Sequence, residues 1–87
     1  MVFIEERGRI YAADETGAVT AEILFHDEGE DAVCVVRTYV AESLRGQGIA
    51  GKLMEAAAEA AKKRGKKVAA ACSYAEAWLQ KHPEYKK

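Results

Sequence analysis

The sequence predicts a mixed α/β fold, in which an antiparallel β-meander is followed by a β-α-β crossover and a short C-terminal helix. Three observations support this expectation. Residues 2–40 form short apolar or alternating stretches between turn-forming residues, residues 47–64 have the periodicity of a helix, and another short apolar stretch follows at 68–72. With 87 residues, 49% of them hydrophobic, we expect residues 1–87 to be one small domain with a single core.

The first half of the chain predicts strands joined by tight turns. Residues 2–5 and 9–13 are expected to be strands on either side of a turn at Gly8. Residues 14–17 have the composition of a second turn. In residues 19–26, apolar side chains then alternate with mostly polar ones, which is typical of a half-buried strand.

After an acidic turn at 27–31, residues 32–36 are apolar at every position, which predicts a central strand covered on both faces. The polar continuation at 37–40 is typical of a strand end that opens onto a site. The helical pattern follows, and Gly65 is the expected left-handed stop. The expected buried face of that helix consists of Ile49, Leu53, Ala56, Ala57 and Ala60.

The last part of the chain completes a crossover. The strand at 32–40, the helix and the strand at 67–72 form a β-α-β unit, so we expect the two strands to be parallel neighbours or near-neighbours. Residues 74–81 are expected to form a final helix closed by His82 and Pro83.

Composition excludes several classes of function. A formal net charge of −1 gives no overall attraction to nucleic acid, and no apolar run approaches the roughly 20 residues that span a membrane. The N-terminus lacks the cationic start of a signal peptide, and the two cysteines, Cys34 and Cys72, form no disulfide framework. His26 and His82 are isolated, so no metal site is expected. We therefore expect a cytoplasmic protein without a nucleic-acid or membrane partner.

The most informative segment is Arg45–Lys52, which fits three phosphate-binding patterns wholly or nearly. Its glycines form G-x-G-x-x-G, residues 46–52 form G-x-x-x-x-G-K-[ST] without the final hydroxyl, and Arg45, Gly48 and Ala50 form R-x-x-G-x-[GA]. All three patterns use glycines that let the backbone approach a ligand, before a helix whose first amides attract anions. The alternative is a glycine-rich turn that binds nothing.

The surrounding sequence excludes two of the three patterns. A nucleotide P-loop needs Ser or Thr after the lysine to hold magnesium, and position 53 is Leu. A dinucleotide site needs its first glycine at the end of the strand and an acid at the tip of the next one. Here residues 41–45 intervene, and the next strand ends at Cys72 and Ser73. The R-x-x-G-x-[GA] pattern remains.

With that pattern, the stretch from Val36 to Leu53 resembles the acetyl-coenzyme A signature of the GNAT superfamily of N-acetyltransferases. The order of predicted strands and helices agrees with that fold. The short chain, Cys72-Ser73-Tyr74 after the last strand and His82-Pro83-Glu84-Tyr85 near the C-terminus resemble its small, single-domain acetyltransferase-like branch. The resemblance covers roughly residues 2–85.

The resemblance implies acetyl-coenzyme A as the cofactor, with backbone amides at 47–52 on the pyrophosphate and two basic side chains adding positive charge. It further implies that the pantetheine arm pairs with an exposed strand edge at 38–40. The residues thus assigned to the cofactor are Thr38, Tyr39, Val40, Arg45, Gly46, Gln47, Gly48, Ile49, Ala50, Gly51 and Lys52.

The chain departs from the family where the chemistry is usually completed. Many members have a Tyr proton donor in the last helix, and the corresponding residue here is Leu79. The small branch commonly has His where this chain has Arg37, so a candidate base is also missing.

Cys72 is the remaining candidate catalytic residue. It lies between a strand end and a helix start, where helix amides favour a thiolate that could act as nucleophile, or where the thiol could donate a proton. A cysteine that only packs beside the cofactor is the alternative. Ser73 is expected to cap the following helix, Tyr74 to form part of the cleft wall, and Cys34 to lie at the other end of the sheet.

The sequence therefore predicts a protein that binds acetyl-coenzyme A and transfers its acetyl group to an amine. The acceptor is left open between a protein lysine, a protein N-terminus and a small amine. Two alternatives remain: a module that binds or senses coenzyme A without efficient turnover, and an interaction domain that has lost the ligand.

Overall fold

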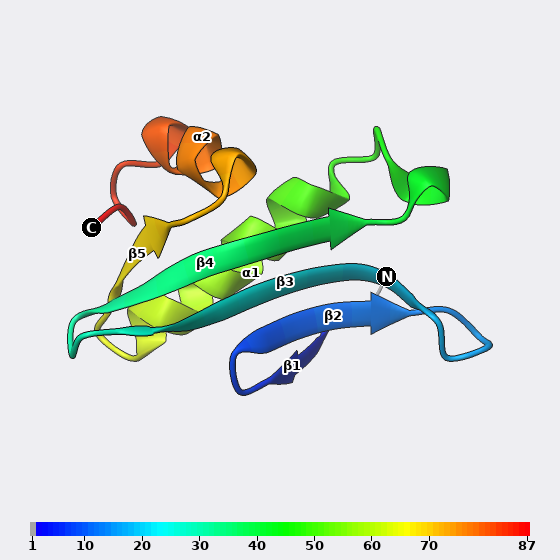
Figure 1. Cartoon of the computed structure of the whole chain (residues 1–87), viewed down its shortest axis with the longest axis horizontal. Helices are drawn as coiled ribbons and strands as arrows, with labels where there is room; N and C mark the ends of the chain where they lie inside the picture. The colour runs from blue at the N-terminus through cyan, green and yellow to red at the C-terminus, as the bar shows by residue number, and fades with distance from the viewer. Residues whose placement is uncertain (1) are drawn as a thin grey trace.

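A computed structural model describes residues 2–87 and confirms the predicted architecture (Figure 1). The elements in chain order are β1 (Ile4–Glu6), β2 (Arg9–Ala13), β3 (Val19–Glu28), β4 (Ala32–Val40), the short 3-10 helix η1 (Glu42–Leu44), α1 (Ile49–Lys63), β5 (Lys67–Ala70) and α2 (Ser73–Lys81). The strands form one five-stranded sheet in the order β1-β2-β3-β4-β5. The first four are antiparallel, whereas β4 and β5 are parallel, as expected of a β-α-β unit.

The observed strand boundaries differ from the predicted ones in three places. β1 begins at Ile4, whose partner is Tyr11, and Val2 before it is exposed. β3 runs on through the acidic segment to Glu28, because Glu28 pairs with Ala32, so the turn is reduced to residues 29–31. β5 ends at Ala70, where its pairing with β4 stops.

The buried face of α1 is rotated from the predicted one. Ile49, Leu53 and Ala57 are buried as expected, but Ala56 and Ala60 are only partly buried. The reason is that α1 packs across β3, β4 and β5 rather than against a single strand. The additional buried positions of the helix are Met54, Ala58 and Ala61.

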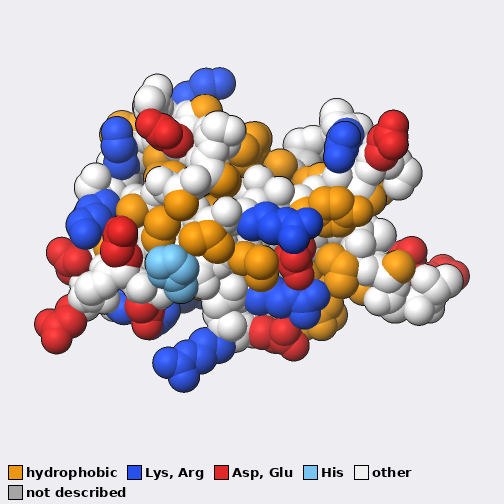
Figure 2. Space-filling model, viewed as in Figure 1, with side chains coloured by type: hydrophobic (Ala, Val, Ile, Leu, Met, Phe, Trp, Pro, Cys, Tyr) orange, Lys and Arg blue, Asp and Glu red, His pale blue; other side chains and the backbone are white. Residues whose placement is uncertain are grey.

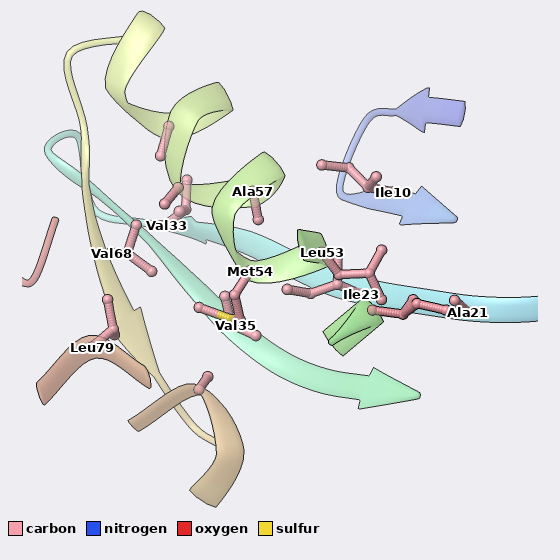
Figure 3. Packing of buried hydrophobic residues seen from close by; sticks show 14 of the residues in the cluster. Ile10, Ala21, Ile23, Val33, Val35, Leu53, Met54, Ala57, Val68 and Leu79 are labelled. Atoms are coloured by element: carbon pink, nitrogen blue, oxygen red, sulfur yellow. The ribbon is translucent and has the colours of Figure 1, made fainter. Parts of the chain in front are cut away.

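The core is a single cluster to which β2, β3, β4, β5 and both helices contribute (Figure 3). The side chains of Leu53 and Met54 in α1 point toward Ile23 and Val35 in the sheet, and Leu79 of α2 lies beside Val68. No side-chain nitrogen or oxygen within residues 2–87 is buried without a hydrogen-bond partner. Apolar burial therefore accounts for the cohesion of the helices with the sheet.

The C-terminal residues cover the outer edge of β5. The N–H of Val68 donates to the carbonyl of Tyr85 at 2.8 Å, and the N–H of Lys87 donates to the carbonyl of Val68 at 2.9 Å. Tyr85 also donates its hydroxyl to Glu59 of α1 at 3.0 Å. The chain end thus closes a strand edge that would otherwise be exposed.

One position of the central strand β4 was predicted wrongly. Residues 32–35 are buried, as expected of a strand covered on both faces, but Val36 is 39% exposed. The register explains the difference: Leu24 pairs with Arg37 and Phe25 with Val35, so Val36 is an extra residue in β4. Val36 therefore forms a β-bulge, a feature that bends the strand and redirects its side chains.

None of the helices within residues 2–87 is long and apolar enough to cross a membrane.

Candidate functional site

The second half of β4 has a free backbone edge. β4 pairs with β5 only from Ala32 to Val35, and the N–H of Ala71 adds one further bond to the carbonyl of Val35 at 2.8 Å. Residues 37–40 pair with β3 alone. The strands β4 and β5 therefore separate beyond Val35, and the predicted edge at 38–40 lies along that separation (Figure 1).

Hydrogen bonds at the end of β4 show which way this edge points. The N–H of Ala41 donates to the carbonyl of Thr20 in β3 at 2.7 Å, so the carbonyl of Val40 points to the other side. There it accepts a bond from Nε of Arg45 at 3.1 Å. Because backbone groups of alternate residues point the same way in a strand, Thr38 also directs its backbone groups to the free edge.

The loop that follows β4 has the geometry of an anion site. Gly46 and Gly48 have φ angles of 82° and 74°, in the left-handed region that glycine tolerates best, and a Cβ at either would meet no atom within 4 Å. Gly48 is the N-cap of α1 and provides no side-chain cap, so the first amides of the helix are left for another partner.

The remaining residues of the loop differ in whether a ligand can reach their side chains or only their backbone. Ile49 buries its side chain in the core, so only its backbone is available to a ligand. Gln47 and Lys52 are exposed, and Ala50 and Gly51 are partly buried. The loop thus has backbone amides and an exposed lysine that a ligand could contact, and its assignment to the cofactor stays a prediction.

The start of α2 lies beside the start of α1. The hydroxyl of Tyr74 is 3.6 Å from where a Cβ on Gly51 would be, and partial burial raises the pKa of this hydroxyl. Leu79, which the resemblance aligns with a tyrosine of many family members, is part of the core. The sequence predicts Tyr74 only as part of the cleft wall, and the Cys-Ser-Tyr motif after β5 is the sequence feature that points to this residue.

Cys72 is the N-cap of α2, and its Sγ accepts the N–H of Ala75 at 3.4 Å. The expectation that Ser73 caps this helix is therefore wrong: the helix begins at Ser73, one position later than the cap. Cys72 is partly exposed and follows Ala71, the last residue bonded to β4. It stands where the two strands separate.

The two cysteines have different surroundings. Cys34 is buried, and burial, together with the charges of Glu28 and Cys72, raises the pKa of its thiol. Cys34 pairs with Ala69, only three residues before Cys72, so the expected placement at the other end of the sheet is wrong. Both cysteines are free.

This difference predicts selective alkylation. Since the thiolate is the reactive form, iodoacetamide at neutral pH should modify Cys72 at least about ten times faster than Cys34. Peptide mass spectrometry over a time course measures both rates, and a denatured sample, in which both should react alike, is the control. Equal rates in the folded protein would contradict the burial of Cys34.

A groove of about 1020 Å³ lies elsewhere, between the C-terminal half of α1, β3 and the β1–β2 turn. Phe25, Val33 and Ala61 line it together with charged residues of both signs. None of the predicted site residues contributes to it, and no cluster of metal-binding side chains occurs in residues 2–87. Size alone therefore does not identify the site; the glycine loop has the chemistry that an anionic ligand needs.

Comparison with known proteins relates this geometry to a family. The model of the GCN5-related N-acetyl-transferase family matches residues 9–87. A search of curated proteins found no match. A Staphylococcus aureus protein that is described as GCN5-like, and that was solved by NMR, is 30% identical with a TM-score of 0.76, over 97% of this chain and 82% of that one.

Two larger structures resemble the chain over part of their length. An IAA acetyltransferase of Bacillus cereus is 28% identical, with a TM-score of 0.67, over 87% of this chain and 54% of that one. The GNAT family N-acetyltransferase YhbS of Escherichia coli, in complex with CoA, is 25% identical, with a TM-score of 0.61, over 71% of this chain and 38% of that one. Given the family match over residues 9–87, the chain belongs to the GCN5-related N-acetyltransferase family.

Proposed function

We propose that this protein binds acetyl-coenzyme A and transfers the acetyl group to an amine, with residues 1–87 acting as one domain. The observation that carries the proposal is the junction of the free β4 edge with the uncapped start of α1. Family membership and the CoA complex of YhbS support the same ligand. Two free cysteines are in keeping with a reducing, cytoplasmic location.

The pyrophosphate is assigned to the loop. Amides from Gln47 to Gly51 would donate to its oxygens, because they lie at the positive end of the α1 dipole. The N–H of Lys52, which the sequence also assigned to the pyrophosphate, already donates to the carbonyl of Gly48 at 3.2 Å, so Lys52 would contribute its side chain. Arg45 and Lys52 add charge, and the bond from Arg45 to the carbonyl of Val40 holds the guanidinium between the loop and the strand. Gly46 and Gly48 keep the backbone free of side chains.

The pantetheine arm is assigned to the free edge. Thr38 and Val40 direct backbone donors and acceptors away from β3, and Tyr39 lies between them. An extended chain with amide groups pairs with such an edge in the manner of an added strand. The thioester end would then lie toward the bulge at Val36 and the thiol of Cys72.

Two residues are candidates for the chemistry at that end. Cys72 could attack the thioester carbonyl, forming S-acetylcysteine and releasing the thiol of coenzyme A; a neutral amine would then attack, forming the amide and restoring the cysteine. In direct transfer to the amine, Tyr74 could instead protonate the leaving sulfur, since its hydroxyl carries a proton at neutral pH and lies beside the start of α1.

A second candidate function is binding of coenzyme A without efficient turnover. The position of Leu79 in the core favours it, because no proton donor replaces the family's tyrosine there. Arg37 likewise offers no base where the small branch has histidine.

Calorimetric titration with acetyl-coenzyme A and with coenzyme A tests the binding on which both candidates depend. We expect saturable binding of each ligand. If neither binds, both functions are excluded.

Replacing Cys72→Ala tests the covalent route. Intact-mass spectrometry after incubation with acetyl-coenzyme A should show an adduct of about 42 Da on the wild-type protein and none on Cys72→Ala. Cys34→Ala is the matched control and should keep the adduct, since Cys34 is buried. Binding without an adduct in the wild type would exclude acetyl-Cys72 and leave direct transfer or sensing.

A further inference from the structure

Where β2 and β3 meet the second half of β4, the sheet has one face that α1 does not cover. Figure 1 shows α1 behind β3 and β4, and the buried residues Ile23 and Val35 point toward it (Figure 3). On the opposite face, the register places side chains of three neighbouring strands in two rows. One row contains Tyr11, Glu22 and Tyr39, and the other contains Arg9, Leu24 and Arg37.

Most charge on this face is neutralised within the protein. Nε of Arg9 donates to the carboxylate of Glu22 at 2.6 Å, and its Nη1 donates to Glu6 at 3.2 Å. The same guanidinium lies 3.7 Å from the ring centroid of Tyr11. Arg9 and Glu22 thus form an ion pair, and the carboxylate of Glu22 is not free to attract a cationic ligand.

Arg37 is the exception on this face. Its partner across the strand pair is Leu24, and among residues 2–87 it forms no salt bridge. Its guanidinium is exposed and lies 5.8 Å from the ring centroid of Tyr39. In Figure 2, basic and acidic groups meet in the middle of this face, surrounded by hydrophobic side chains.

The position of Arg37 connects this charge to the site. Arg37 directly follows the bulge at Val36 and begins the part of β4 that β5 leaves free. An acceptor that reaches the thioester end from the open face would pass this guanidinium. Carboxylates and phosphates are the groups that an arginine binds by two parallel hydrogen bonds, and the phosphates of coenzyme A are already assigned to the loop, so a carboxylate remains for Arg37.

We propose that Arg37 binds a carboxylate of the acceptor, so that the substrates are amines that also carry a carboxylate. The inference rests on the proposed acetyl transfer and names its substrate class. Diamines and polyamines are disfavoured, because in these two rows their second cation would meet the positive charge of Arg37, and the carboxylate of Glu22 is already bound to Arg9.

The test compares two pairs of amines that differ only in a carboxylate: ornithine with putrescine, and phenylalanine with phenethylamine. A third pair consists of two peptides that have either Glu or Lys after the N-terminal residue. The carboxylated acceptors should have kcat/KM values at least about 10-fold higher than their counterparts. Arg37→Gln should reduce that preference about 5- to 20-fold through KM, and Arg37→Glu should reverse it. Arg7→Gln, which removes an exposed arginine from the β1–β2 turn, should change nothing.

A binding measurement separates this inference from the proposed function. In NMR titration of the protein without coenzyme A, N-acetylornithine should shift the Nε–Hε signal of Arg37, and N-acetylputrescine should not. Acetyl-coenzyme A affinity should be the same in the wild type and Arg37→Gln. Weaker acetyl-coenzyme A binding in Arg37→Gln would assign Arg37 to the cofactor and overturn the inference, as would equal use of both members of each pair. Failure of the wild type to bind acetyl-coenzyme A would overturn the proposed function itself.

Discussion

Replacing Gly48→Glu is expected to weaken acetyl-coenzyme A binding by more than about 100-fold, or roughly 2.7 kcal/mol. Gly48 is the N-cap of α1, so a carboxylate at this position would lie beside the amides that are assigned to the pyrophosphate. Its negative charge would repel the phosphates. The space around the position is open, so the fold should survive. A side chain at a φ of 74° should cost about 1–2 kcal/mol of stability. Calorimetry measures the affinity, and thermal unfolding measures the stability.

Gly17→Glu is a matched control for that variant. Gly17 has a φ of 89°, no atom lies within 4 Å of an added Cβ, and it belongs to the β2–β3 turn rather than to the loop. It should therefore lose similar stability and keep its affinity. If both variants bind alike, the pyrophosphate does not lie at Gly48 and the placement of the cofactor is wrong.

Local features of the chain were predictable because they depend on neighbouring residues. Gly65 ends α1 in the left-handed conformation, as the sequence predicted, because the stop requires only a residue without a Cβ at that point. β2 has its predicted bounds, Arg9–Ala13, because a turn at Gly8 and a turn at 14–17 limit it on both sides.

Features that depend on distant pairing were not predictable. The bulge at Val36 exists because β3 and β4 change register there, and no property of Val36 alone reveals that. The rotation of the α1 face toward Met54 likewise depends on which strands of the sheet α1 crosses. These are the positions that shape the site, because they decide which residues of β4 face the open side of the sheet.

The same limit applies to the candidate residues. The glycine loop was found from sequence because its chemistry lies in the backbone of consecutive residues. The approach of Tyr74 to Gly51 joins two helix starts, and the capping role of Cys72 depends on where α2 begins. Neither feature can be read from the spacing of residues along the chain.

Replacing Leu53→Ser is expected to have the largest effect on stability, although it completes the pattern G-x-x-x-x-G-K-[ST] of a nucleotide P-loop. The side chain of Leu53 is fully buried, and in Figure 3 it points from α1 toward Ile23. Serine there would leave a cavity and bury a hydroxyl, at a cost of about 3–5 kcal/mol. A domain of this size has a free energy of unfolding of roughly 0.05–0.15 kcal/mol per residue, so much of it would be lost. Urea unfolding measures the loss.

The variant should bind neither ATP nor Mg²⁺, because a hydroxyl that points into the core cannot reach a ligand on the loop. Leu24→Ser, on the open face of the sheet where the leucine is only partly buried, is the control and should lose less than about 1.5 kcal/mol. Nucleotide binding by a folded Leu53→Ser would mean that residue 53 faces the loop rather than the core. Residue 53 therefore separates this loop from a P-loop in two ways: it has no hydroxyl, and the packing of α1 on the sheet directs its side chain into the core.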